Sequence, residues 1–309
     1  MTTIIKFLLL ALCWLNCGSL LAQGEFITTW KTDNPGTTDA NSIEIPTGGG
    51  TFSYTVDWGD GSTDTTVYAG NATHTYATPG TYTVSISGDF PHLKFDFGGD
   101  NEKLLSVEQW GDQVWGSMSY SFYNCSNMVI NATDAPNLSG VTDMSGMFLG
   151  ASSFNQDISN WNVSNVGNMN SMFSNAYSFN QDIGGWDVFN VDDMHAMFKD
   201  ASSFNQDIGT WDVSLVRDMS EMFQGATAFN QDIGAWTIEY VRSMKKMFRH
   251  ATAFNQSLNG WDVSGVWDMS EMFWGASSFN QNIGSWSVYN VQDMSYMFYE
   301  ATSFNQDIS

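Results

Sequence analysis

The chain has 309 residues, with 10 Lys or Arg against 33 Asp or Glu, and its formal net charge is −23. This charge excludes a nucleic-acid-binding surface, because contacts to phosphate depend on Lys and Arg. An aromatic content of 15% argues against intrinsic disorder, since disordered chains lack the large apolar side chains that offset the entropy lost on ordering.

The first 23 residues are predicted to be a secretory signal peptide. They carry one cation, Lys6, followed by a short apolar run, and the small residue Ala22 lies near their end. The apolar run is too short to span a bilayer. The alternative for this segment is a lipid anchor on Cys17. Removal of residues 1–23 leaves Cys125 as the single cysteine, so we expect no intramolecular disulfide.

Residues 24–100 are predicted to form a small β-sandwich. Apolar and polar residues alternate over 51–58 and 81–86, which is typical of antiparallel strands, and 59–62 supply turn residues. This part of the chain resembles the PKD domain, an immunoglobulin-like β-sandwich, over three motifs: Asp57-Trp58-Gly59-Asp60-Gly61-Ser62, His74-Thr75-Tyr76 and Pro79-Gly80-Thr81-Tyr82-Thr83-Val84. The resemblance implies a spacer or interaction module without activity of its own.

Two carboxylates of the first motif, Asp57 and Asp60, are weak candidates for a calcium site, because a tight glycine turn brings their hard oxygens close together. The alternative is that both residues only build the turn. His74 and Tyr76 are interpreted as packing residues.

The second half of the chain is an array of 25-residue repeats. Phe-Asn-Gln recurs every 25 residues from Phe154 to Phe304, and Met-x-x-Met-Phe recurs with the same period from Met144 to Phe298. Trp stands at one position of six successive repeats, beginning with Trp161. The abundant methionine and tryptophan therefore belong to one repeated unit.

Each repeat is predicted to fold as a strand followed by a short helix. Met169, Met172, Phe173 and Ala176 have the i, i+3, i+4, i+7 spacing of one helical face, and the preceding Asn168 is a capping residue. Asp218 with Glu221, and Asp268 with Glu271, have the spacing of capping boxes. Stacked repeats would bury these faces in a continuous core, giving a strand–helix solenoid.

The asparagine of Phe-Asn-Gln is the same in all seven repeats, from Asn155 to Asn305. We expect it to form an amide ladder that satisfies backbone groups of its own and the neighbouring repeat. A binding role is the alternative.

The repeats resemble the BspA-like leucine-rich repeat surface proteins of bacteria. The resemblance rests on Phe204-Asn205-Gln206-Asp207-Ile208-Gly209-Thr210-Trp211-Asp212-Val213-Ser214 and Asp218-Met219-Ser220-Glu221-Met222-Phe223. It implies secretion or surface exposure and a role in protein interaction or adhesion. Within this scheme, residues 101–143 are predicted to be an N-terminal capping repeat and residues 144–309 the solenoid, with an incomplete last repeat. A truncated gene or a missing anchoring domain is expected to account for that incomplete repeat.

Two ion-binding interpretations compete with simpler ones. The Met-x-x-Met spacing suits Cu(I), which prefers thioethers, but the following Phe and Ala complete an apolar face and favour a core. Acidic residues also recur at one position of four successive repeats: Asp157, Asp182, Asp207 and Asp232. They are interpreted either as a calcium site or as a solvated acidic face.

Positions that vary between repeats are where ligand specificity is expected. One group stands out in the acidic chain, and we call it the basic–aromatic patch: Arg242, Lys245, Lys246, Arg249, Trp267, Trp274, Tyr289, Tyr296 and Tyr299. It has two interpretations, cation–π pairs between stacked repeats or a partner-binding surface, because Trp, Tyr and Arg dominate interface hot spots.

No catalytic motif is recognised, and His195 and His250 are interpreted as exposed residues of the predicted helices. The sequence therefore predicts a non-enzymatic, secreted or cell-surface adhesion protein that binds a protein or cell-surface partner. The alternatives are a carbohydrate-binding module, with exposed Trp and Tyr stacked on sugars, and a purely structural stalk. No cofactor other than calcium, no transmembrane helix and no nucleic-acid partner are expected.

Overall fold

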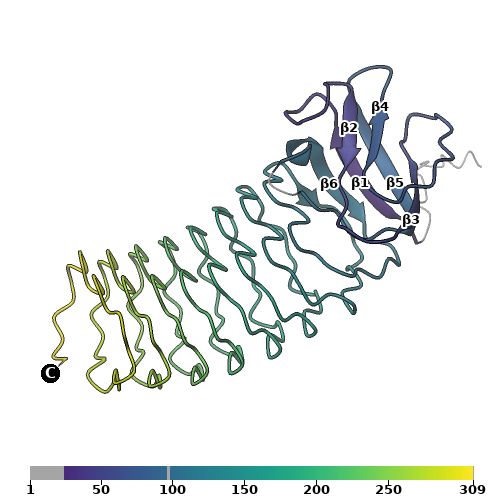
Figure 1. Cartoon of the computed structure of the whole chain (residues 1–309). Coiled ribbons are helices and arrows are strands. Elements are labelled where there is room, and N and C mark those ends of the chain that lie inside the picture. Colours follow the sequence, from purple (N-terminus) through teal and green to yellow (C-terminus); the bar gives the residue numbers. More distant parts are fainter. Residues whose placement is uncertain (1–23, 96–97, 309) are drawn as a thin grey trace, which may run out of the picture.

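The computed structural model describes residues 24–95 and 98–308, so the predicted signal peptide and the candidate lipid-anchor cysteine lie outside the described residues. A compact β region is followed by a row of stacked coils that extends away from it (Figure 1). The strands are β1 (Phe26–Lys31), β2 (Ser42–Ile45), β3 (Ser53–Asp57), β4 (Ala72–Thr75), β5 (Thr81–Asp89), β6 (Leu104–Gln109) and β7 (Val129–Ile130), and one 3-10 turn, η1 (Asn101–Lys103), precedes β6.

The β region contains two sheets. The larger has the order β3-β5-β1-β6-β7 and the smaller consists of β2 and β4. Strands β3 and β5 pair antiparallel, as the alternation in the sequence predicts, with Tyr54 opposite Gly88 and Val56 opposite Ile86. Strand β7 pairs parallel with β6, and both belong to the segment predicted as a capping repeat. The predicted boundaries at residues 100 and 143 stay predictions.

Aromatic side chains fill the space between the sheets. Trp30, Trp58 and Tyr76 are buried, and the Tyr76 hydroxyl donates a hydrogen bond to the Trp58 carbonyl at 3.0 Å. The turn after Trp58 requires glycine at position 59, where φ is +73° and a Cβ atom would lie 2.1 Å from the Thr83 carbonyl oxygen.

The predicted fold class, a PKD-like β-sandwich followed by a strand–helix solenoid, is wrong. The described residues contain no α-helix, and the repeat array contains only turns and isolated parallel bridges. The bridges join equivalent residues of successive repeats, beginning with Asp143 to Asn168 and Asn168 to Asp193. Each 25-residue repeat forms one coil, and we call the series of coils the coil stack.

The hydrogen bonds of the Met-x-x-Met-Phe segment explain why it is not helical. The N–H groups of Met169, Ser171 and Phe173 donate to carbonyls of the next coil, at 3.0, 2.8 and 2.9 Å. Only the intervening N–H groups bond locally, as from Met172 to the Met169 carbonyl at 3.2 Å. In an α-helix that begins here, the Phe173 N–H would donate to the Met169 carbonyl four residues back, so its bond to the next coil excludes the helical pattern. The apolar spacing i, i+3, i+4 is nevertheless compatible with both.

The backbone of these segments also includes left-handed residues. Ser171 and Asn175 have φ values of 55° and 57°, and equivalent residues of other coils have similar values. Glu221, predicted to complete a capping box, is one of them, with φ of 59°. Capping residues such as Asp218 instead accept the N–H two residues later, here that of Ser220 at 2.7 Å.

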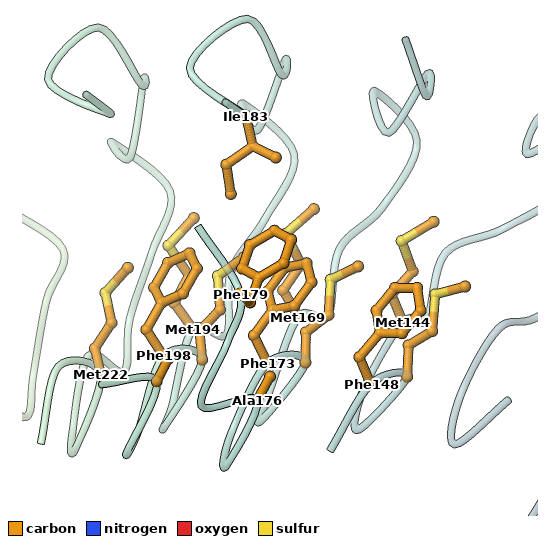
Figure 2. Packing of buried hydrophobic residues seen from close by; sticks show 14 of the residues in the cluster. Met144, Phe148, Met169, Phe173, Ala176, Phe179, Ile183, Met194, Phe198 and Met222 are labelled. Atoms are coloured by element: carbon orange, nitrogen blue, oxygen red, sulfur yellow. The ribbon is translucent and has the colours of Figure 1, made fainter. Parts of the chain in front are cut away.

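Identical side chains stack along the axis of the coil stack to form its core (Figure 2). Phe173 lies 5.6 Å from Phe148 and 5.7 Å from Phe198, with nearly parallel rings. The methionines, such as Met169, form neighbouring columns and are fully buried, which agrees with the core interpretation of the Met-x-x-Met spacing. The repeated tryptophans from Trp186 to Trp286 also bond to the preceding coil, as from the Trp211 indole N–H to the Ile183 carbonyl at 3.1 Å.

The predicted asparagine ladder is confirmed. The Asn180 Oδ1 atom accepts the backbone N–H of Asn205 at 2.9 Å and the Gln206 side-chain amide at 2.9 Å. The same pair of bonds repeats one coil further on, between Asn205 and the residues Asn230 and Gln231. This column therefore has a structural use.

The coil stack continues the core of the β region without a break. The Trp110 ring lies edge-on to Trp161 of the first regular coil, with centroids 5.6 Å apart. The inter-coil bonding also begins upstream, because the N–H of Met118 donates to the Asp143 carbonyl at 3.0 Å. Within residues 24–95 and 98–308, no helix is long and apolar enough to cross a membrane.

Candidate interaction surface

The structure brings part of the basic–aromatic patch together. The Arg249 guanidinium carbon lies 4.4 Å from the centre of the Trp274 ring in the next coil, which is the predicted cation–π arrangement. Tyr296 and Tyr299 surround the same indole, with ring centroids 5.6 and 4.8 Å from it. Both tyrosines are exposed, while Arg249 and Trp274 are half-buried.

The cations of this group are paired with acids that the sequence reasoning did not assign to them. Arg249 forms an ion pair with Glu271 at 2.8 Å, and Lys246 lies 3.8 Å from Glu221. Glu221 also accepts a hydrogen bond from Lys199 of the preceding coil at 2.6 Å. Each of these contacts joins adjacent coils. The sequence signal that could have indicated these ion pairs was a separation of 22 to 25 residues between oppositely charged side chains. The patch is therefore less basic than its sequence indicates.

The pKa of Glu221 reflects this environment. Burial of the carboxyl group raises the pKa, but the Lys199 hydrogen bond and the charges of Lys199 and Lys246 outweigh it, so that the pKa lies below its ordinary value. The carboxylate is thus stabilised in its charged form, and its favourable contribution to folding is lost when the pH falls through the lowered pKa.

The remaining residues of the patch lie at other positions of the coils. The Arg242 guanidinium donates to the carbonyls of Glu239 at 3.1 Å and Gly265 at 3.3 Å. Trp267 and Tyr289 are exposed. Lys245 lies near the carboxylate of Asp293, whose pKa is lowered by hydrogen bonds from Ser295 and, to a smaller extent, by Lys245.

Sequence reasoning missed three exposed apolar residues of the coil stack. Phe189, Leu215 and Tyr240 occupy the turn between two buried β-branched residues of their coils, such as Val188 and Val191. Other repeats place Ser, Asn, Glu or Gly at these positions. The signal available in the sequence was a large apolar residue at a column that is otherwise polar.

The calcium candidates build a turn in the β region. Asp57 Oδ1 accepts the Gly59 N–H and Asp60 Oδ1 accepts the Ser62 N–H, both at 2.9 Å. The second oxygen of Asp60 lies 2.8 Å from the His74 ring nitrogen Nε2. The hydrogen bonds from Ser62 and then His74 lower the pKa of Asp60 to about 2. The His74 ring stacks on Trp58, in agreement with its interpretation as a packing residue.

The acidic column of the coil stack, which contains Asp182 and Asp207, also builds turns. Asp182 and Asp207 each accept the N–H of the glycine two residues later, at 2.9 Å. Across the described ranges, no three His, Cys, Asp or Glu side chains are grouped so that they could hold a metal ion. Cys125 is buried with a free thiol, and burial raises the pKa of this group well above its ordinary value.

Comparison with known proteins identifies one family. The family described as "Mycoplasma protein of unknown function, DUF285" matches residues 116–236 and 219–309, which together span more than half of the chain. The chain therefore belongs to the DUF285 family. No curated protein and no solved structure matches it.

Proposed function

We propose that this member of the DUF285 family is a non-enzymatic, secreted or cell-surface interaction protein that binds a protein or cell-surface partner through variable positions of its coil stack. The observation that carries the proposal is the cluster of Trp274, Tyr296 and Tyr299, where aromatic rings gather at positions that the core does not use. Aromatic residues at a surface contribute large contact areas and dominate interface hot spots.

The repeat chemistry supports a binding role. Repeated residues such as Phe204 and Met219 are committed to the core, and repeated acids such as Asp207 are committed to turns. Differences between coils are therefore concentrated in exposed side chains, as in other stacked-repeat proteins that use an extended surface for recognition. The resemblances to PKD domains and to BspA-like surface proteins are consistent with export and adhesion, and both remain part of the proposal.

The proposal predicts that aromatic side chains of the patch are needed for attachment to cells. Trp274→Ala combined with Tyr296→Ala should reduce binding of the purified, fluorescently labelled chain to cell surfaces by at least about tenfold, since two hot-spot residues contribute at least about 1 kcal/mol each. Arg249 and Glu271 are left in place, so that the ion pair between the coils is kept.

The matched control is Tyr177→Ala, which removes an exposed tyrosine at a different position of the coil stack. Thermal unfolding followed by circular dichroism verifies that the variants are folded. Equal cell binding by the double variant and the control would contradict this assignment of the binding surface.

A further inference from the structure

A buried ion pair lies inside the β region, at the 3-10 turn η1. The side chains of Lys103 and Asp100 are 1% and 0% exposed, and the Lys103 Nζ atom lies 3.7 Å from Asp100 Oδ1. Buried charges are costly unless polar groups surround them. The surrounding groups come from residues 36–44, which follow β1 and include the start of β2, and we call this segment the covering loop.

Four oxygen atoms of the covering loop surround the ammonium group. Three are the backbone carbonyl oxygens of Thr38, Asp39 and Ser42, which lie 3.0, 2.9 and 2.9 Å from Lys103 Nζ. The fourth is the Thr38 hydroxyl oxygen, at 2.8 Å. An ammonium group has only three hydrogens, so the loop presents more oxygens than separate hydrogen bonds require. Such a set of oxygens surrounds the charge as a whole, as in a site for a spherical cation.

Asp100 holds these oxygens in place and supplies the opposite charge. Its Oδ1 atom accepts the N–H groups of Thr37 and Thr38 at 2.9 and 3.1 Å, and its Oδ2 atom accepts the N–H of Glu44 at 2.8 Å. The Thr38 hydroxyl donates to Oδ2 at 2.6 Å, because an ionised carboxylate only accepts, and its lone pairs are left to face Lys103. The carboxylate therefore shapes the covering loop through bonds that do not involve the lysine.

Gly36 allows the covering loop to lie directly against the ion pair. A Cβ atom at this position would lie 2.3 Å from Asp100 Oδ1 and 2.7 Å from the Lys103 Cε atom. The loop backbone thus closes over both side chains, which agrees with their negligible exposure. The oxygens around Nζ are thereby separated from bulk solvent.

The distances indicate the size and charge of the cation that these oxygens fit. Protein oxygens lie about 2.3–2.6 Å from Ca²⁺ and about 2.0–2.1 Å from Mg²⁺, so either ion would require the loop to contract. The observed distances of 2.8 to 3.0 Å suit a larger ion. Backbone carbonyl oxygens replace the hydration shell of K⁺ in channel filters. The single carboxylate of Asp100 balances one positive charge, which also favours a monovalent cation.

We propose that the covering loop and Asp100 form a binding site for a monovalent cation of the size of ammonium or K⁺, and that the chain fills this site with its own Lys103 ammonium group. The filled site ties the covering loop to η1 without a metal ion. It is separate from the Trp274 cluster, so the proposed function does not depend on it.

Chemical replacement of the ammonium group tests the site. Lys103→Ala removes the atoms that propylammonium would restore, and its melting temperature in choline chloride should be about 10 °C lower than that of the unchanged chain, because Asp100 keeps a buried charge without its partner. Propylammonium chloride or KCl at about 0.2 M should restore about half of this loss, relative to choline chloride of equal ionic strength.

Lys103→Met is the matched control, because it fills most of the space of the lysine stem and carries no charge. Its melting temperature should also fall, and neither K⁺ nor propylammonium should restore it. The unchanged chain should melt at the same temperature in all three salts. If Lys103→Ala does not fold in choline chloride, its refolding yield in each salt replaces the melting temperature.

Recovery of Lys103→Ala by neither K⁺ nor propylammonium would overturn the proposal, as would an unchanged melting temperature of this variant in choline chloride. Equal recovery with n-propanol, which fills a similar volume without a charge, would show that only packing was lost and would overturn it as well. Equal recovery of Lys103→Met would have the same meaning. Recovery by Ca²⁺ but not by K⁺ would contradict the assigned size and charge of the cation.

Discussion

Asn205 connects three coils through its backbone and its side chain. Its backbone N–H donates to Asn180 Oδ1, and its own Oδ1 accepts the N–H of Asn230 and the side-chain amide of Gln231. These groups are partly buried, so a missing acceptor leaves donors without compensation. The need to satisfy these donors explains why asparagine occurs at this position in all seven repeats.

We expect Asn205→Leu to lower the free energy of unfolding by about 2 kcal/mol, the typical cost of leaving partly buried donors unsatisfied. Asn205→Asp keeps an oxygen at the Oδ1 position, so the cost should stay below about 1 kcal/mol. Urea denaturation followed by tryptophan fluorescence measures both values. Equal destabilisation by the two changes would show that the acceptor oxygen is not what the ladder needs.

At the scale of the element, the Met-x-x-Met-Phe segment replaces a helix by a chain of turns. Its peptide groups Asn168–Met169 and Asn170–Ser171 point their C=O toward the preceding coil and their N–H toward the next one. This arrangement requires left-handed residues at regular intervals, including Ser171. Non-glycine residues pay for that conformation with about 1 to 2 kcal/mol each.

Replacing serine by glycine should therefore change the free energy of unfolding in opposite directions at a left-handed serine and at a serine outside the left-handed region. Ser171→Gly should raise the free energy of unfolding by about 0.5 kcal/mol, since the relieved strain exceeds the extra entropy of the unfolded chain. Gly146 already occupies the equivalent position one coil earlier, with φ of 58°. Ser178→Gly, at a residue outside the left-handed region, should lower the stability by about 0.5 to 1 kcal/mol.

Differential scanning calorimetry of the two serine variants, with Ser171→Val as a third, measures these effects. The valine should be the least stable, because a β-branched side chain tolerates positive φ poorly. A lower melting temperature for Ser171→Gly than for Ser178→Gly would contradict the strain argument.

At the scale of the whole molecule, the coil stack aligns acidic residues in columns on a chain of net charge −23. Asp182, Asp207 and Asp232 occupy equivalent turns of consecutive coils and are all exposed. Compact states with such excess charge are destabilised by self-repulsion, which salt screens.

The melting temperature should therefore rise by at least about 2 °C when NaCl is added to 1 M, where the Debye length is about 3 Å. Calorimetry at constant pH measures the shift, and an uncharged osmolyte of equal osmotic strength serves as the control. A decrease with salt would mean that ion pairs such as Lys199 with Glu221 outweigh the repulsion.

Much of the candidate surface was open to prediction from the sequence, and part of it was not. The contact between Arg249 and Trp274 follows from their separation by one repeat. The pairing of Arg249 with Glu271 was missed, since Glu271 had been interpreted as a capping residue of a helix. The exposed side chains of Phe189, Leu215 and Tyr240 were missed because most other coils carry polar residues or glycine at their positions.

The sequence by itself determined the 25-residue period, the residues of the core columns and the asparagine ladder, because identical spacing places identical side chains above one another. It also determined strands β3 and β5 through their period-two alternation. Only the tertiary structure decided between helix and turns for the Met-x-x-Met-Phe segment. The apolar spacing is the same in both conformations, and the choice depends on whether an N–H such as that of Phe173 finds its acceptor within the segment or in the next coil.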